Sequence, residues 1–297
     1  MSATPSVLYD APGPRARRLS LVTSIVLGVV ITAAVVWLIW RLGQPRVTVN
    51  GAVLTGLWDP SRWDIFVNDP RVWEGLLIRG LLMGTLRAAG LAAVLSIIAG
   101  VLLCFARSAR SKWIRVPAAI VLEFFRGMPV LLMMLFIMLA LATSGYWAVV
   151  LALTVYNGAI IGEALRAGIA ALPRGQREAG LSLGLTELST RLRIEFPQAF
   201  RQMLPIILAQ LVVLLKDTSL AYVVAYPEIL RISQQMRDYY GSTTYSFSLF
   251  LIVWAVYLVV NMSLSTAARW LARRTGPKAQ AALMTQNTST MQAPDGA

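Results

Sequence analysis

Residues 162–186 read GEALRAGIAALPRGQREAGLSLGLT, a polar stretch punctuated by glycines and arginines. An apolar run precedes it, WAVVLALTVYNGAII (147–161), and another follows, MLPIILAQLVVLL (203–215). Runs of this kind suit the hydrocarbon of a bilayer, whereas a charged segment between them does not. The pattern therefore predicts two membrane helices joined by a polar loop at the membrane surface.

The composition of the whole chain points the same way. Of its 297 residues, 57% are hydrophobic and 14% are charged, whereas a soluble domain carries about 25% charged residues. Strand-like alternation is missing, which argues against a membrane barrel, and backbone groups inside lipid are satisfied by helices. We therefore predict an all-α polytopic membrane protein with about six transmembrane helices. The apolar runs are 19–40, 81–106, 116–142, 147–165, 203–225 and 246–271.

The formal net charge of +13 is a topology signal. Lys and Arg gather in the N-terminal tail, in alternate loops and in the C-terminal tail. An even number of spans puts both termini on one side, and the positive-inside rule makes that side the cytoplasm. We therefore expect a multi-pass protein of the cell membrane, surrounded by lipid, and no nucleic-acid partner. The other loops mix in acidic residues: Asp59, Asp64, Asp69, Glu228 and Asp238.

The segments outside the main block of helices have distinct characters. We predict a cytoplasmic tail (1–18), and an additional N-terminal helix (19–40) that is too long and lacks the cleavage site of a secretory signal. Residues 43–74 read as an extracytoplasmic segment with three tryptophans suited to the membrane interface. Residues 276–297 are polar, and we expect no fixed structure there.

Catalytic chemistry is not expected of this chain. It has no histidine and one cysteine, Cys104, so a cysteine metal cluster and an intrachain disulfide are excluded. It also lacks the G-x-x-x-x-G-K-[ST] phosphate loop. We therefore predict that it is not an enzyme and carries no cofactor, and that any ATP is hydrolysed by a partner.

The polar loop has internal punctuation. Helix-forming residues occupy 176–182, Gly184 follows as a natural C-terminal stop, and Thr186 offers an N-cap to a second helix that begins near Glu187. The pattern predicts a short helix, a sharp turn and a second helix at the cytoplasmic face. Two interpretations stay open on physical grounds: a docking device for a soluble partner, or a solvated loop.

This loop resembles the EAA loop of ABC-importer permeases, whose pattern is E-A-A, three residues, G, nine residues, I-x-L-P. Two positions depart from it, because Gly180 replaces the second alanine and Phe196 replaces the leucine. A glycine lowers helix propensity by up to about 1 kcal/mol, so we expect a weaker or shorter helix at Gly180. The residues that match the pattern in register are Glu178, Ala179, Gly184, Ile194 and Pro197.

The resemblance extends along the chain from about residue 78 to residue 272. FFRGMPVLL (124–132), the approach to the loop (162–179), FPQAFRQMLP (196–205) and LLKDTSLAYVV (214–224) resemble the polar amino acid branch of these permeases. Within that branch, SVLYDAPGPRARR (6–18) and YPEILR (226–231) are most similar to actinobacterial glutamate permeases.

The family implies a type I ABC importer permease (MetI-like) fold in a permease domain over 78–272, with a coupling loop at about 174–197. It implies a second permease subunit in a homodimer or heterodimer, a dimer of cytoplasmic ATPases and an extracytoplasmic substrate-binding protein. The substrate it suggests is glutamate, with glutamine or arginine as alternatives. The residues it assigns to ATPase coupling are Arg177, Glu178, Ala179, Gly180 and Gly184.

Polar residues inside the apolar runs are candidates for the transport path or its gate. A charge near the bilayer centre costs at least about 2.5 kcal/mol on insertion scales. Two roles stay open for the polar run 216–219, a brace between helices or direct contact with substrate. Its members are Lys216, Asp217, Thr218 and Ser219.

Arg126 is a further candidate, early in the third run. It could contact an anionic substrate, and we favour an ion pair with Glu163 that acts as a gate or brace. Gly127 and Pro129 weaken the helix beside it, and Pro197 is predicted as another structural break.

Two other classes of function compete with an ATP-driven importer. They are a secondary carrier, which would depend on an ion gradient, and a membrane scaffold, which would show no flux. Neither explains the register of the loop.

Overall fold

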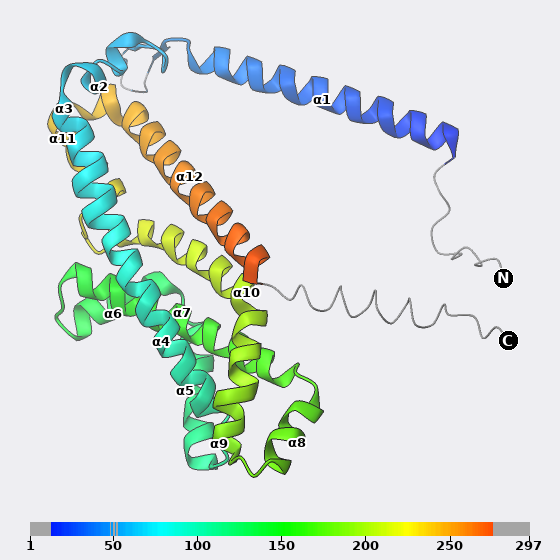
Figure 1. The fold of residues 1–297 in the computed structure, drawn as a ribbon. Coiled ribbons are helices and arrows are strands. Elements are labelled where there is room, and N and C mark those ends of the chain that lie inside the picture. Colours follow the sequence, from blue (N-terminus) through cyan, green and yellow to red (C-terminus); the bar gives the residue numbers. More distant parts are fainter. Residues whose placement is uncertain (1–12, 48, 50, 52, 276–297) are drawn as a thin grey trace.

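The computed structural model describes residues 13–47, 49, 51 and 53–275. The first twelve residues of the predicted N-terminal tail and the predicted tail at 276–297 lie outside the described residues. Figure 1 shows an elongated bundle of helices from which the first helix diverges. The principal helices are α1 (Pro14–Leu42), α4 (Arg87–Arg107), α5 (Lys112–Gly127), α6 (Val130–Ala140), α7 (Gly145–Ala170), α10 (Phe196–Asp217), α11 (Ile229–Tyr240) and α12 (Ser242–Thr275).

Short elements complete the chain. The two strands pair antiparallel, with Arg46 opposite Leu54 and Val47 opposite Val53. The short elements are β1 (Arg46–Val47), β2 (Val53–Leu54), η1 (Pro60–Arg62), α2 (Ile65–Asn68), α3 (Pro70–Trp73), η2 (Glu74–Leu86), α8 (Arg174–Ser182), α9 (Glu187–Thr190), η3 (Arg191–Glu195) and η4 (Thr218–Tyr222).

The prediction of an all-α protein with about six spans is confirmed. The described residues hold five helices long and apolar enough to cross a membrane, or six when one bent pair is included. That pair is α5 and α6, which meet at 108° where α5 ends at Gly127 and α6 begins after Pro129. The predicted run 81–106 is part of a longer continuous helix, Pro70–Arg107, because α3 and η2 lead into α4 without a break.

Pro197 does not end a helix, so the break predicted there is wrong. The chain stays helical from Glu187 to Tyr222. The five residues of η3 before the proline form a π-helical turn, and Pro197 lies in the first turn of α10. A π turn is wider than an α turn, which accommodates a ring that would otherwise meet the carbonyl of the preceding turn.

The segment between α1 and η2 folds against the beginning of α12 and the end of α11. The side chain of Arg62 is buried and donates to the Thr244 carbonyl at 3.1 Å. The Tyr245 hydroxyl donates to Asp64 at 2.9 Å, and the Tyr240 hydroxyl donates to Asp69. The hydrogen bond from Tyr240 lowers the pKa of Asp69. These contacts tie segments that lie more than 170 positions apart in the sequence.

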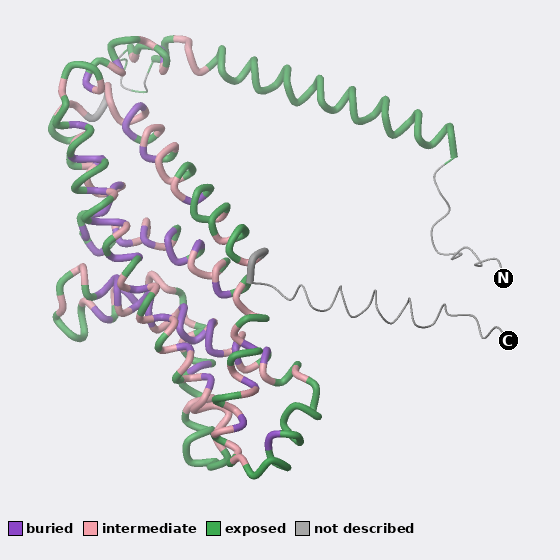
Figure 2. The backbone as a smooth tube through the Cα atoms, viewed as in Figure 1, coloured by how far each residue is buried: buried purple, intermediate pink, exposed green. Residues whose placement is uncertain are grey.

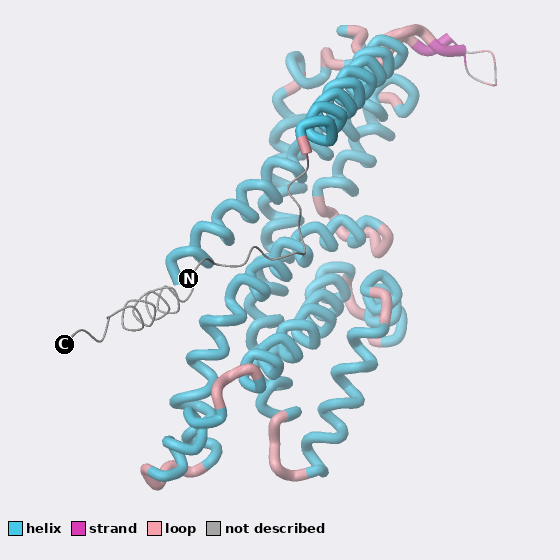
Figure 3. Tube along the Cα trace, turned by 90° about the vertical axis from the view of Figure 1, so that its right-hand side faces the viewer, coloured by secondary structure: helices cyan, strands magenta, loops and turns pink. Residues whose placement is uncertain are grey.

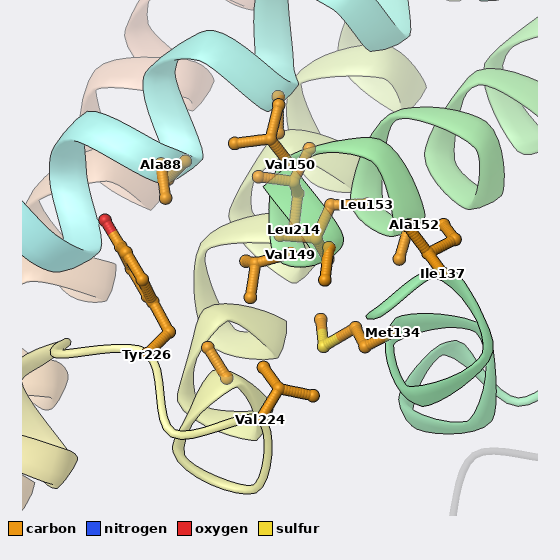
Figure 4. Packing of buried hydrophobic residues seen from close by; sticks show 14 of the residues in the cluster. Ala88, Met134, Ile137, Val149, Val150, Ala152, Leu153, Leu214, Val224 and Tyr226 are labelled. Atoms are coloured by element: carbon orange, nitrogen blue, oxygen red, sulfur yellow. The ribbon is translucent and has the colours of Figure 1, made fainter. Parts of the chain in front are cut away.

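The core lies where α7 crosses α4, α6 and α10. In Figure 4 Val149, Val150 and Leu153 of α7 pack in one cluster with Leu214 of α10 and Met134 of α6. Figure 2 shows this crossing as the region where buried residues are most frequent. The helices that carry the cluster thus form the rigid centre of the bundle.

Glycines allow α4 and α7 to approach closely. A Cβ at Gly100 would lie 2.7 Å from Cγ2 of Ile161, and a Cβ at Gly158 would lie 2.9 Å from the Cβ of Ala99. In lipid the hydrophobic effect does not drive helices together, so close packing of small residues is a main source of association. The glycines therefore help to hold this helix pair together.

We expect Gly100→Val to destabilise the protein by about 1–3 kcal/mol, because the new methyl groups overpack the contact with α7. Gly90→Val is the matched control in the same helix, since a Cβ at Gly90 meets nothing within 4 Å. Thermal unfolding of the purified protein measures both midpoints. Equal shifts for the two variants would contradict the close-packing account.

Candidate functional site

The polar loop between α7 and α10 forms the helix, turn and second helix that the sequence predicts. Helix α8 ends with Gly184 at φ +81°, and the Gly184 N–H donates to the Leu181 carbonyl at 3.0 Å. The Leu185 N–H donates to the Gly180 carbonyl at 3.2 Å, which completes a Schellman motif. Thr186 then caps α9 by accepting the Ser189 N–H at 3.2 Å. The turn is therefore fixed by backbone geometry.

Gly180 has a different role from the one the sequence suggested. Helix α8 continues past it to Ser182, so the expected weakening of the helix is not seen. Gly180 is buried, and a Cβ there would lie 2.7 Å from Cγ2 of Thr190 and 2.9 Å from Cδ1 of Ile194. The glycine is the point where α8 touches the helix that enters the membrane.

Polar contacts attach the loop to the turn between α4 and α5. Glu187 accepts from Arg177 at 3.1 Å and also pairs with Arg110, which lies in the turn between α4 and α5. Arg191 donates to the carbonyl of Ser108 in that turn. Exposed ion pairs are worth at most about 1 kcal/mol each, so position rather than stability is what they supply.

The remaining coupling candidates face outward. Glu178 and Ala179 are exposed, and the described residues provide no hydrogen bond or ion pair to Glu178. Arg177, by contrast, points back toward Glu187. The structure thus divides the five predicted coupling residues into Arg177, Gly180 and Gly184, which fix the loop, and Glu178 and Ala179, which lie on its free surface.

A second ion-pair cluster joins α4, α5 and α7, and it corrects one prediction. Glu163 pairs with Arg166 at 2.5 Å and with Arg107 at 3.5 Å, rather than with Arg126. Arg126 instead pairs with Glu123 at 3.7 Å, one turn earlier in α5. Arg166 reaches Glu163 because it lies three residues further along the same helix face. Arg107 connects both glutamates, since it lies 3.6 Å from Glu123.

The polar run 216–219 lies at the end of α10 and the beginning of η4. Lys216 is exposed, and with Ser219 and Asn261 it lines a groove of about 390 Å³ between α10 and α12. Thr218 is buried and donates to the Leu215 carbonyl at 2.6 Å. Within the described part of the chain, Lys216 and Asp217 form no ion pair with each other or with another residue. The structure does not bring this run together with the cluster around Glu163.

Two buried polar groups escaped the sequence reasoning. The half-buried Gln210 of α10 donates to the buried Asn157 of α7 at 2.8 Å and bridges the two helices. Glu228 is fully buried and caps α11 by accepting the backbone N–H groups of Leu230 and Arg231. It also accepts the Tyr257 hydroxyl at 2.9 Å. An isolated amide in an apolar run, and an acidic residue directly before a helix, were the available signals.

No group of three or more metal-ligating side chains occurs among the described residues. The described residues thus provide three features: an exposed helix with a fixed turn, ion pairs that reach α4, α5 and α7, and a groove lined by Lys216, which has no ion-pair partner among these residues.

Known proteins resemble this chain in sequence and in fold. The family model described as "Binding-protein-dependent transport system inner membrane component" matches residues 77–277. The glutamate transport system permease protein GluD of Corynebacterium glutamicum is 34% identical over 227 residues, which are 74% of this chain and 81% of that protein. The probable glutamine ABC transporter permease protein GlnP of Bacillus subtilis is 36% identical over 208 residues, 68% of this chain and 93% of that protein.

Solved structures agree with the sequence relatives. The crystal structure of an amino acid ABC transporter with histidines matches with a TM-score of 0.61 at 28% identity, over 69% of this chain and 96% of that one. An inward-facing structure of the MetNI methionine ABC transporter matches with a TM-score of 0.57 at 20% identity, over 70% of this chain and 98% of that one, which shows the fold alone. Figure 3 shows the described helices in a view turned by 90° from that of Figure 1.

Proposed function

Because the chain belongs to the family of binding-protein-dependent transport system inner membrane components, we propose that it couples ATP hydrolysis by a partner to amino acid import through α8. It is a permease of an amino-acid ABC importer, a transport component rather than an enzyme. The observation that carries the proposal is the division of the loop into a fixed inner face at Gly180 and a free outer face at Glu178.

The inner face supplies a route for motion. A displacement of α8 reaches η3 and α10 through the contact at Gly180, and it reaches the turn between α4 and α5 through Glu187. The outer face, with Glu178 and Ala179, is the surface that a cytoplasmic ATPase dimer would grip. A rigid helix presented on two membrane helices is suited to carrying force.

The other partners follow from the family. An extracytoplasmic substrate-binding protein would deliver the substrate, and a second permease subunit, identical or related, would complete the path. Both termini lie in the cytoplasm in this arrangement, in keeping with their basic residues. A secondary carrier or a scaffold leaves the fixed loop without a purpose.

Glutamate is the substrate we propose, with glutamine or arginine as the alternatives. GluD, a glutamate permease, covers 74% of this chain, more than the glutamine permeases do. The ammonium of Lys216, which forms no ion pair with another described residue, offers an anionic substrate a favourable charge. Asp217, Thr218 and Ser219 would brace that site. The ion-pair cluster in which Arg107 connects Glu163 with Glu123, the partner of Arg126, would belong to a cytoplasmic gate.

We expect Glu178→Lys to reduce co-purification with the partner ATPase by at least about tenfold, because a reversed charge in an interface costs several kcal/mol. Gln176→Lys is the control. It also adds a cation to α8, but on the side of the helix where the Gln176 side chain accepts a hydrogen bond from Gln198 of α10. Pull-down of the ATPase from membranes measures both variants. Undiminished capture by Glu178→Lys would rule out docking on this face.

Uptake tests the substrate. Vesicles that contain this permease, its ATPase and its binding protein should accumulate labelled glutamate, and unlabelled glutamate should compete much better than glutamine or arginine. Uptake that persists with an ATPase unable to hydrolyse ATP would reject an ATP-driven importer. Stronger competition by glutamine or arginine would leave the importer in place and reassign its substrate.

A further inference from the structure

Helix α1 is a candidate membrane span, and no other helix among the described residues packs along its length. It has 29 residues and no buried side chain, and in Figure 2 it is exposed along its whole length. At 1.5 Å per residue it is about 44 Å long, enough to cross a hydrocarbon layer of about 30 Å. It lies outside the matched family region, which begins at residue 77.

The outer end of α1 is anchored at the beginning of α12. The Trp58 indole N–H donates to the Ile39 carbonyl at 2.8 Å, and the Leu57 N–H donates to the Leu42 carbonyl at 3.0 Å. The Trp58 ring packs edge-on against Phe247 of α12, with ring centroids 5.9 Å apart. Ile39 and Phe247 therefore lie at about the same depth, on either side of Trp58.

An exposed apolar stripe continues from this anchor along α12. Trp254, Leu258 and Met262 are 54%, 44% and 60% exposed. They follow Phe247 by two, three and four helical turns, so all four side chains share one helix face. We call Phe247, Trp254, Leu258 and Met262 the α12 stripe.

Helix α1 carries small residues at the matching depths. Three residues of α1 precede Ile39 by the same separations by which the stripe residues follow Phe247. Thr32 corresponds in this way to Trp254, Gly28 to Leu258 and Ser24 to Met262. Small residues let membrane helices approach, and here each would face a large side chain of α12. The Thr32 hydroxyl already donates to the Gly28 carbonyl at 2.8 Å, so burying Thr32 against α12 would not leave its hydroxyl without a hydrogen bond.

The bilayer limits how far the two helices can diverge. In Figure 1 they spread apart from their common outer end. Spans tilt by about 0–40° from the membrane normal, and α1 and α12 both run inward from that end. We propose that α1 lies antiparallel along the α12 stripe of its own chain, with Thr32, Gly28 and Ser24 opposite Trp254, Leu258 and Met262.

Disulfide formation in lipid vesicles tests this packing in the full chain, with Cys104→Ala as background. The pair Gly28→Cys and Leu258→Cys should cross-link several-fold faster than Gly28→Cys with Val259→Cys. Val259 lies at nearly the same depth and is the more exposed of the two residues, by 63% against 44%, but it is turned by about 100° on the helix. Adding Trp58→Ala should slow the favoured cross-link, because it removes the anchor.

Two results would overturn the proposal. Equal rates for the Leu258 and Val259 pairs would mean that α1 is surrounded by lipid. A second test uses two differently tagged copies, each of which carries one cysteine of the favoured pair. If these copies cross-link to each other more readily than the two cysteines do within one chain, α1 packs on a second copy and not on its own α12.

Discussion

The contact between α8 and η3 at Gly180 is the constraint on which the rest of the cytoplasmic face depends. With no side chain at Gly180, the two helices meet at van der Waals distance, and a Cβ would intrude on Thr190 and Ile194. The Schellman turn at Gly184 fixes the chain between them. The turn and the contact together hold α8 against η3, the segment that leads into α10.

Further contacts join this loop to the helices of the bundle, and under the proposed function they would carry a displacement of α8. Glu187 and Arg191 reach the turn between α4 and α5, and the cluster around Arg107 and Glu163 joins α4, α5 and α7. The glycine-lined contact of α4 with α7 makes those two helices move together. Beyond them α10 ends at the polar run that lines the groove with α12, so the loop and the groove occupy opposite ends of one helix.

Local patterns predicted local structure well. The fixed spacing from Glu178 to Pro197 and the stop at Gly184 anticipated the helix and turn, because both depend on residues a few positions apart. Partners distant in sequence were another matter. Glu163 forms ion pairs with Arg107 of α4 and with Arg166 one turn along its own helix, rather than with Arg126. Pro197 follows a π-helical turn and does not interrupt the helix. Glu228 is buried and accepts a hydrogen bond from Tyr257 of α12. Both features depend on how whole helices pack.

The most direct test of the central claim is a distance measurement across the cytoplasmic face of the assembled transporter. Spin labels at Leu183, which directly follows α8, and at Trp113 of α5 would report it, since both side chains are exposed, by 81% and 91%. If α8 moves as one body with the turn between α4 and α5, the distance distribution stays the same without nucleotide and with bound ATP. A distribution that shifts or broadens with ATP would show that α8 flexes on its own, and would contradict the account.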